Sequence, residues 1–356
     1  MRIVVLTQGD QGGGAEFVAR TWARCLEERG HEVAFLVTSP PDGAPAPGVV
    51  YLRAASAGPW TAVLSLRHHI KRNRPDVVLS LLTFPNLVAL LAVLLSRRRT
   101  PVVISERNVP SVLLRQQGRS QRSQLWLARL LYRSAAGAVA ISHPVAADLV
   151  AGFSVDPARC TVVLNPATAK LGQDVPPRQR PDGEALTLVL PCRLVPQKDP
   201  LLLPAVARLL AERGRDVRIL VFGAGPLEER LSREAHDAGV PATMAGWQDE
   251  WFRHCPPGSV VCLPSHVEGF GNVLVETAAM NVPVVTMSTA LGVADAVVPG
   301  VTGYLAATRE PDEFADLVEA ADRLPAWDMA GWLNEFSPET STTRLERVLR
   351  RQVRGA

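Results

Sequence analysis

Two glutamates flank a glycine-containing segment that could bind an anion. Glu268 precedes Gly269-Phe-Gly-Asn272, and Glu276 follows it. The segment comes after a short apolar run, 260–264, that is typical of a buried strand, and before a stretch, 273–280, with the composition of a helix. A helix that starts here would present unpaired backbone N–H groups and the positive end of its dipole to a phosphate.

The two carboxylates indicate what such a segment could bind besides a phosphate. Carboxylates accept hydrogen bonds from hydroxyls, and glycines let a bulky anion approach the backbone. A phosphate between two polyols fits this arrangement, and that describes a nucleotide-sugar. The alternative is a tight turn with a solvated glutamate, because glutamates at this spacing are common by chance.

Two cations and a second glycine-rich turn precede this segment in the chain. Arg193 follows an apolar run at 186–190, and Lys198 lies shortly after it, where the next helical region is expected. Both could bind one anion, since arginine can contact phosphate bidentately and lysine adds a compact charge. Gly223-Ala-Gly-Pro226 would let a nucleoside pass close to the backbone. Each cation taken alone could equally be a solvated side chain at a strand end.

Apolar runs alternate with helical patterns along the whole chain. Strands are expected at 2–6, 32–37, 77–82, 101–105, 137–141, 186–190, 217–222, near 260 and at 282–286, and helices at 15–28, near 60–73, 86–95, 119–133 and 144–151. Such alternation predicts parallel sheets covered on both faces. The uncharged stretch 77–96 is predicted to be a buried strand and helix separated at Pro85, rather than a membrane span.

A proline-rich stretch near residue 176 indicates a linker between two domains. We predict an N-terminal Rossmann-like domain at 1–168, a linker at 169–184, a second domain at 185–325, and a helical segment at 326–356 that packs back on the first domain. Ligands of open α/β sheets lie beyond the carboxyl ends of the strands. The two domains are therefore expected to face a central cleft.

Composition excludes several classes of protein. Hydrophobic residues make up 47% of the chain and charged residues 21%, which is typical of a globular protein. A net charge of +3 and the absence of any common nucleic-acid motif argue against a nucleic-acid partner. The five cysteines and seven histidines show no metal-binding spacing, so no metal is expected. Because residues 1–6 read as a strand rather than a signal peptide, we expect a cytoplasmic protein, peripheral to a membrane at most.

The set and order of motifs resembles the family 4 retaining glycosyltransferases, which have the GT-B fold. The motifs are Gly12-Gly-Gly-Ala-Glu16, Gly30-His-Glu-Val33, Arg193 with Lys198, Gly223-Ala-Gly-Pro226, Ala245-Gly-Trp-Gln-Asp249, Leu263-Pro-Ser265, the segment from Glu268 to Glu276, Pro283-Val-Val285 and Gly300-Val-Thr-Gly-Tyr304. The resemblance covers essentially the whole chain. It implies an α/β protein with two doubly wound Rossmann-like domains, an acceptor-side domain at 1–168 and a donor domain at 185–325.

The resemblance also implies a reaction. A hexosyl group would move from a nucleotide-sugar, expected to be a UDP-sugar from its frequency in the family, to an acceptor hydroxyl with retention of configuration. The nucleotide-sugar would be a co-substrate, and neither a cofactor nor a metal would be needed. The acceptor stays open among a lipid-linked glycan, a natural-product aglycone and a saccharide.

Roles for individual residues follow from the same resemblance. Arg193 and Lys198 would bind the donor diphosphate and neutralise the leaving group, and Glu268 would position the transferred sugar in the transition state; these three are the catalytic candidates. Glu276 would bind the ribose. The donor-binding candidates are Gly13, Gly14, Arg193, Lys198, Gly223, Glu268, Gly269, Phe270, Gly271, Asn272, Val273 and Glu276.

Two segments depart from the usual family pattern. Ser105-Glu-Arg-Asn108 resembles a variant found among members that build surface glycans, and it places Arg107 and Asn108 near the acceptor and the transferred sugar. The alternative is a loop cap with a solvated arginine. The usual Gly-Gly-x-x-Glu motif appears as Leu291-Gly-Val-Ala-Asp295, with one glycine and a shorter acid.

Basic residues gather in the first domain. Between residues 97 and 147 the single acid is Glu106, and the arginines are Arg97, Arg98, Arg99, Arg107, Arg115, Arg119, Arg122, Arg129 and Arg133. This asymmetry suggests a surface for peripheral contact with anionic membrane lipids, or for an acceptor that carries phosphates. The alternative is a solvated helix face, with residues 125–132 forming a stripe toward the core.

Three other functions are compatible with parts of the sequence. A catalytically impaired nucleotide-sugar-binding or scaffold protein would keep the donor motifs while losing the chemistry. A nucleotide-sugar epimerase of the same fold would use no acceptor. A dinucleotide-dependent dehydrogenase would explain glycine-rich turns, but residues 9–14 lack the Gly-x-Gly-x2-Gly spacing.

Overall fold

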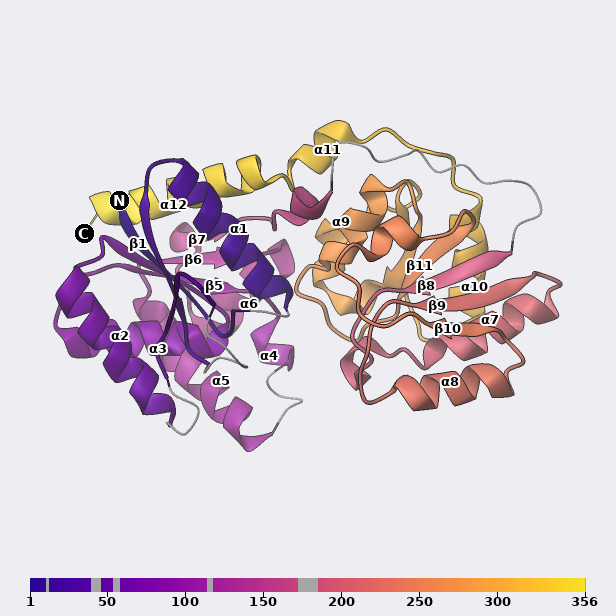
Figure 1. Cartoon of the computed structure of the whole chain (residues 1–356), viewed down its shortest axis with the longest axis horizontal. Helices are drawn as coiled ribbons and strands as arrows, with labels where there is room; N and C mark the ends of the chain where they lie inside the picture. The colour runs from indigo at the N-terminus through magenta and orange to yellow at the C-terminus, as the bar shows by residue number, and fades with distance from the viewer. Residues whose placement is uncertain (11–12, 40–45, 54–57, 114–117, 172–184, 356) are drawn as a thin grey trace. The chain divides into compact units, whose positions relative to one another are not determined.

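The computed structural model describes residues 1–10, 13–39, 46–53, 58–113, 118–171 and 185–355. It divides into two compact units, each with its own parallel sheet (Figure 1). Unit 1 comprises Met1–Ala169 and Asn334–Ala356, and unit 2 comprises Lys170–Leu333. Most of the predicted linker at 169–184 lies outside the described residues.

Unit 1 contains a seven-stranded parallel sheet in the order β3-β2-β1-β4-β5-β6-β7. Its strands are β1 (Arg2–Thr7), β2 (Glu32–Val37), β3 (Val49–Tyr51), β4 (Val77–Leu81), β5 (Val102–Glu106), β6 (Gly137–Ala140) and β7 (Cys160–Val162). The central strands β4, β5 and β6 are buried at every position. This burial explains their continuous apolar sequences, since helices cover both faces of a doubly wound sheet.

Helices of unit 1 form two layers on the faces of this sheet (Figure 1). They are α1 (Gly14–Glu28), α2 (Pro59–Asn73), α3 (Thr83–Ser96), α4 (Pro110–Leu113), α5 (Arg119–Leu131), α6 (His143–Phe153) and α12 (Pro338–Arg354). α1 packs against α12 on one face, while α3 packs against both α2 and α5 on the other. The indole of Trp22 in α1 donates a 3.0 Å hydrogen bond to the Ser341 hydroxyl of α12. The C-terminal helix thereby completes the core of the N-terminal unit.

The uncharged stretch 77–96 forms strand β4 and helix α3, as predicted, but α3 begins at Thr83, so Pro85 lies in its first turn rather than between the two elements. Leu82 makes the turn between them with a left-handed φ of 78°. Among the described residues, no helix combines the length and apolar character needed to cross a membrane.

Unit 2 contains a six-stranded parallel sheet in the order β10-β9-β8-β11-β12-β13. Its strands are β8 (Leu186–Leu190), β9 (Val217–Val221), β10 (Ala242–Met244), β11 (Ser259–Leu263), β12 (Val284–Met287) and β13 (Gly303–Ala306), and its helices are α7 (Leu202–Glu212), α8 (Glu228–Asp237), α9 (Asn272–Ala279) and α10 (Pro311–Asp322). The strand order reverses between β8 and β11. Loops that follow these two strands therefore meet at one edge of the sheet, where open α/β sheets bind ligands.

Two local features differ from the sequence expectation. The strands β3, β7, β10 and β13 were not predicted, because each has only three or four residues and shows no periodicity of its own. The C-terminal helical segment is also interrupted, with α11 (Ala330–Asn334) separate from α12. Ser337 caps α12 by accepting a 3.1 Å hydrogen bond from the Thr340 backbone N–H, and Pro338 occupies the first helical position, which favours a new helix start.

Candidate functional site

A buried carboxylate lies just beyond the end of β11. Glu268 Oε1 is 2.5 Å from Lys198 Nζ and accepts a 2.6 Å hydrogen bond from the Ser265 hydroxyl. Lys198 and Glu268 are brought together because β8 pairs directly with β11. Sequence reasoning placed both residues at the site, but it assigned no role to Ser265.

The loops that carry these two side chains are also joined through their backbones. The His266 N–H donates to the Gln197 carbonyl at 2.8 Å, and the Gln197 side chain donates to the Val267 carbonyl at 2.9 Å. Lys198 ends a short 3-10 turn, and α7 begins only at Leu202. The expectation that Lys198 enters the next helix was therefore wrong, because its loop pairs with the β11 loop instead.

The turn between Glu268 and α9 is held against a neighbouring loop. Gly271, the N-cap of α9, has a φ of 91°, a left-handed value that glycine tolerates. A Cβ placed on Gly292 would lie 2.1 Å from the Gly269 carbonyl oxygen, so Gly292 allows the 291–295 loop to approach this closely. The phenyl ring of Phe270 is buried, so its backbone N–H is the group that could reach a ligand.

Glu276 lies in α9, in an environment different from that of Glu268. Its Oε2 accepts a 2.8 Å hydrogen bond from the indole of Trp251. Burial raises the pKa of Glu276 above its ordinary value, and the Trp251 hydrogen bond and the charge of Lys170 oppose that rise. Trp251 was missed from the sequence, since nothing in its local pattern indicates a contact with α9.

The glycine-rich turn after β9 packs against the loop after β8. A Cβ on Gly223 would lie 1.9 Å from the Cys192 carbonyl oxygen, and the Leu194 N–H donates to the Ala224 carbonyl at 3.0 Å. Burial raises the pKa of the Cys192 thiol to about 12, so it stays protonated at neutral pH. Arg193 is exposed, and its carbonyl accepts a 2.9 Å hydrogen bond from the Val195 N–H.

Chemically, these loops of unit 2 bring together groups that could bind an anion at the strand-order reversal. Helix α9 begins at Asn272, and the backbone N–H groups of a first helical turn point toward the N-terminal end of the helix, where an anion can bind. Lys198 has three N–H donors, so it can contact Glu268 and a phosphate oxygen together. In the part of the chain that the structure describes, no group of three or more His, Cys, Asp or Glu side chains is arranged to hold a metal ion.

Two candidate residues of unit 1, Gly13 and Gly14, lie where α1 begins after β1. Gly13 is the N-cap of α1, and Gly14 is the first residue of that helix, after β1. A Cβ on Gly13 would lie 2.2 Å from a carboxylate oxygen of Glu16. Residues 11–12 of the same motif lie outside the described residues.

Ser105-Glu-Arg-Asn108 forms the end of β5 and the loop after it. The Arg107 guanidinium stacks 5.0 Å from the centroid of the Trp22 ring and donates to the Asn165 amide oxygen. The alternative of a solvated arginine is wrong, because Arg107 is buried, and burial lowers its pKa to about 9. Asn108 is half-buried and accepts a hydrogen bond from the Val109 N–H.

Glu106 belongs to a buried polar cluster behind Arg107. It accepts hydrogen bonds from Thr83 at 3.2 Å, from Asn86 at 3.2 Å and from the Tyr132 hydroxyl. Burial raises the pKa of Glu106 to about 7. Glu106 is therefore only partly ionised at neutral pH.

Comparison with known protein families assigns both units. The family model described as "Glycosyltransferase Family 4" matches residues 12–169, and the model described as "Glycosyl transferases group 1" matches residues 186–321. The chain belongs to the family 4 glycosyltransferases. This confirms the family resemblance, while the Ser105-Glu-Arg-Asn108 variant stays a prediction.

Curated relatives in this family match part of the chain. A D-inositol 3-phosphate glycosyltransferase of Frankia alni is 33% identical over 49% of this chain and 47% of its own length. A GDP-mannose-dependent alpha-(1-6)-phosphatidylinositol monomannoside mannosyltransferase of Mycobacterium tuberculosis is 31% identical over 47% of this chain and 48% of its own. The chain thus spans about half the length of these curated relatives.

Solved structures confirm the GT-B fold. The lipopolysaccharide outer core galactosyltransferase WaaB has a TM-score of 0.78 and 16% identity, covering 98% of this chain and 99% of its own. HepE from Anabaena, in complex with UDP and glucose, has a TM-score of 0.74 and 20% identity, with coverage of 98% and 99%.

Proposed function

We propose that this protein is a retaining, metal-independent glycosyltransferase that moves a hexosyl group from a nucleotide-sugar to an acceptor hydroxyl. The observation that carries the proposal is the Lys198–Glu268 pair at the N-terminus of α9, with the buried Glu276 on the same helix. Phosphate would bind to N–H groups and Lys198, and sugar hydroxyls to the two carboxylates. Family membership supports this assignment.

In the proposed reaction, the bond between the sugar C1 and the leaving diphosphate breaks as the acceptor oxygen bonds to C1 on the same face. The acceptor proton passes to an oxygen of the leaving phosphate. Lys198 and Arg193 would stabilise the negative charge that develops on the diphosphate. Glu268, oriented by Lys198 and Ser265, would hold the hydroxyls of the transferred sugar during its oxocarbenium-like transition state.

Residues of unit 1 complete the proposal. Gly13 and Gly14, at the start of α1, would allow the backbone to approach the diphosphate, and Arg107 with Asn108 would lie toward the acceptor. Because Arg107 is held by Trp22 and Asn165, we expect its contribution to be orientation of this loop as well as charge.

The donor is proposed to be a UDP-sugar. Relatives differ on this point: the mycobacterial enzyme is named as GDP-mannose-dependent, whereas HepE was solved with UDP and glucose. The names of three relatives contain D-inositol 3-phosphate, phosphatidylinositol monomannoside and diphospho-undecaprenol, and these compounds indicate acceptors that carry phosphate or lipid. We therefore keep a lipid-linked acceptor as the first to be assayed, ahead of an aglycone or a saccharide.

A thermal-shift screen with UDP, GDP, ADP, TDP and NAD, without added metal, tests the proposal. We expect one nucleoside diphosphate to raise the melting temperature, because a ligand at about a hundred times its Kd adds about 2.7 kcal/mol of stability. The matching nucleotide-sugar should then yield a product whose anomeric configuration, read by NMR, equals that of the donor. Stabilisation by NAD alone, or inversion at the anomeric carbon, would contradict the proposal.

The same assays separate the alternatives. A scaffold protein would bind the nucleoside diphosphate without transferring sugar to any acceptor. An epimerase would change the donor sugar itself with no acceptor present.

A further inference from the structure

Helices α2, α3 and α5 of unit 1 expose large apolar side chains to solvent. Trp60 is 63% exposed on α2, Leu94 is 67% exposed on α3, and Trp126 is 61% exposed on α5. Leu64, Leu95 and Leu130 are exposed beside them. The expectation that residues 125–132 turn their apolar side chains to the core was therefore only partly right: Leu125 and Tyr132 are buried, but Trp126 and Leu130 are not.

Positive charge lies on α2, on α5 and on the three arginines that follow α3, with no acids to compensate it within these helices. None of them contains an aspartate or glutamate. The only acidic residues between positions 59 and 147 are Asp76, which accepts a hydrogen bond from the Arg2 backbone N–H, and the buried Glu106. The exposed basic side chains are Lys71, Arg72, Arg74, Arg97, Arg98, Arg99, Arg119, Arg122, Arg129 and Arg133.

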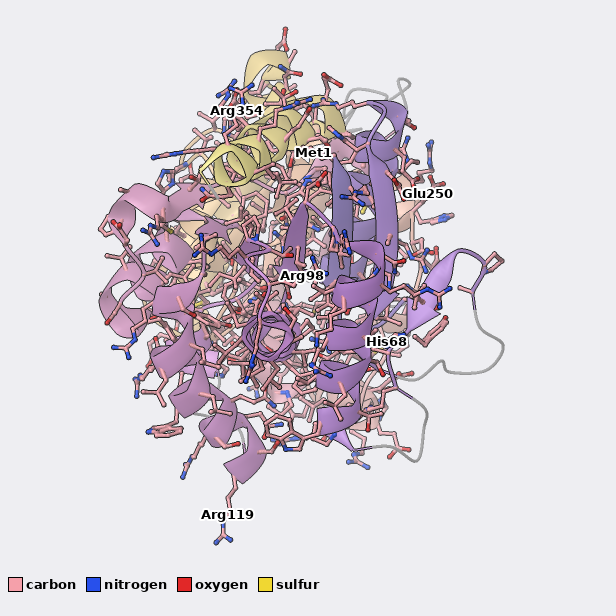
Figure 2. The ribbon with its side chains drawn as sticks, turned by 90° about the vertical axis from the view of Figure 1, so that its left-hand side faces the viewer. Met1, His68, Arg98, Arg119, Glu250 and Arg354 are labelled. Carbon is pink, nitrogen blue, oxygen red and sulfur yellow. The ribbon has the colours of Figure 1, made fainter. Side chains whose placement is uncertain are left out.

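Apolar and basic side chains share the same helix faces. On α5, Arg122, Trp126 and Arg129 recur at helical spacing, and on α2, Trp60 and Leu64 continue toward Lys71. Arg67 Nε donates to the Leu95 carbonyl at 3.1 Å, which joins α2 to the end of α3. In Figure 2, Arg98 lies near the end of α3, beside the α2 helix that carries His68, while Arg119 projects from the start of α5.

We propose that this face, formed by α2, the end of α3 and α5, docks on a bilayer that contains anionic lipids. Lys71, Ser96, Arg97, Arg98 and Arg99 line an open depression where a lipid phosphate could bind. Exposed tryptophans are suited to the boundary between headgroups and acyl chains, and arginines to the negative surface potential. An acidic protein or nucleic acid would use the charge but would leave the exposed leucines without a partner. The proposal concerns lipid binding alone and does not depend on the transfer reaction.

Co-sedimentation of the full chain with vesicles tests this surface. The vesicles are phosphatidylglycerol mixed equally with phosphatidylcholine, and phosphatidylcholine alone is the reference. Binding is expected only to the mixed vesicles. Replacing Arg97, Arg98 and Arg99 together with alanine should reduce the partition coefficient about a hundredfold, because each basic residue near an anionic surface contributes about fivefold.

A matched control lies on the opposite layer of unit 1. Arg347, Arg351 and Arg354 are exposed on α12, and their triple alanine variant changes the net charge equally. The double variant Trp60→Ala and Trp126→Ala should weaken the vesicle binding that remains at high salt, because that part depends on apolar contacts. Trp247 is an exposed tryptophan of unit 2, and Trp247→Ala should leave this binding unchanged. Melting temperatures of all variants verify folding.

Three results would overturn the proposal. One is no binding of the wild type to anionic vesicles. Another is an equal loss in the α12 control. The third is retention of the chain by RNA but not by vesicles, which would assign the face to nucleic acid.

A second, independent observation concerns Arg309, which follows β13. Its Nη1 contacts Asp199 Oδ2 at 2.6 Å and donates to the Pro264 carbonyl at 2.8 Å, and its Nη2 donates to the Ser265 carbonyl at 3.1 Å. Asp199 directly follows Lys198, and Ser265 contacts Glu268. A single guanidinium thus links the two loops that carry the proposed catalytic pair.

We infer that Arg309 is a positioning residue that keeps Lys198 and Glu268 in contact. This inference rests on the proposed function for its kinetic part only. Arg309→Ala should speed amide hydrogen exchange in 196–199 and 264–268 about tenfold, since both loops lose a shared anchor. It should also raise the donor KM about tenfold, with a smaller change in kcat, and Arg309→Lys should recover part of the loss because it can still pair with Asp199.

Arg323→Ala, at an exposed arginine of the same unit, is the control. Unchanged exchange in both loops would overturn the inference even if no donor were found. Faster exchange with an unaltered donor KM would limit Arg309 to stability and overturn its positioning role.

Discussion

Replacing Lys198 with alanine is expected to lower kcat about a hundredfold or more. Two effects add in this variant: the diphosphate loses a cation as it departs, and Glu268 loses its charged partner. The buried Glu268 would keep only the Ser265 hydroxyl on that oxygen among the contacts described. Steady-state kinetics with the donor identified by the thermal-shift screen measures the change.

Lys198→Arg serves as the companion variant for this prediction. It retains the charge but presents a larger, planar group, so we expect partial activity. Arg230→Ala, on the exposed face of α8, should behave as the wild type. Turnover within a few-fold of the wild type in Lys198→Ala would assign this lysine to a structural ion pair.

Glu276→Ala is expected to weaken binding of the nucleoside diphosphate about ten- to a hundredfold. Hydrogen bonds to a charged group contribute about 1.5–3 kcal/mol, and a buried carboxylate that binds ribose hydroxyls would lose them entirely. Isothermal titration calorimetry measures the affinity without requiring an acceptor.

Two variants separate nucleotide binding from local packing. Glu276→Gln keeps an acceptor for the Trp251 indole while it removes the charge, and Trp251→Phe removes the indole donor while it leaves the carboxylate. We expect a clear loss of affinity in the first and a smaller one in the second. If Glu276→Ala binds the nucleotide as tightly as the wild type, the ribose-binding role is wrong.

The organisation of the site within one loop could be predicted from the sequence. Glu268, the glycine turn and Glu276 lie in a single strand–turn–helix segment, so local chain geometry determines their arrangement. The strand and helix of the uncharged stretch 77–96 could also be predicted, because strand–helix alternation continues on both sides of it. Alternating strand and helix patterns and the ordered motifs similarly predicted the fold class.

Contacts between distant segments depended on the tertiary structure. Lys198 and Glu268 are 70 residues apart, and Arg309 and Asp199 are 110 apart. They meet because β8 pairs with β11, with β12 and β13 following at the same side, and strand order cannot be read from local periodicity. The same holds for Trp22 and Ser341, which are separated by 319 residues and join α12 to the N-terminal unit.

Solvent exposure of the first domain could likewise be predicted only in part from the sequence. Sequence composition showed the excess of arginines in the first domain, but it did not distinguish a core-facing stripe from an exposed apolar surface at residues 125–132. Packing of α5 against α3 buries Leu125 and Ala128, which leaves Trp126 and Leu130 on the outer side of the helix. Helical periodicity alone determined which residues share a face, whereas the neighbouring helix decided which face meets solvent.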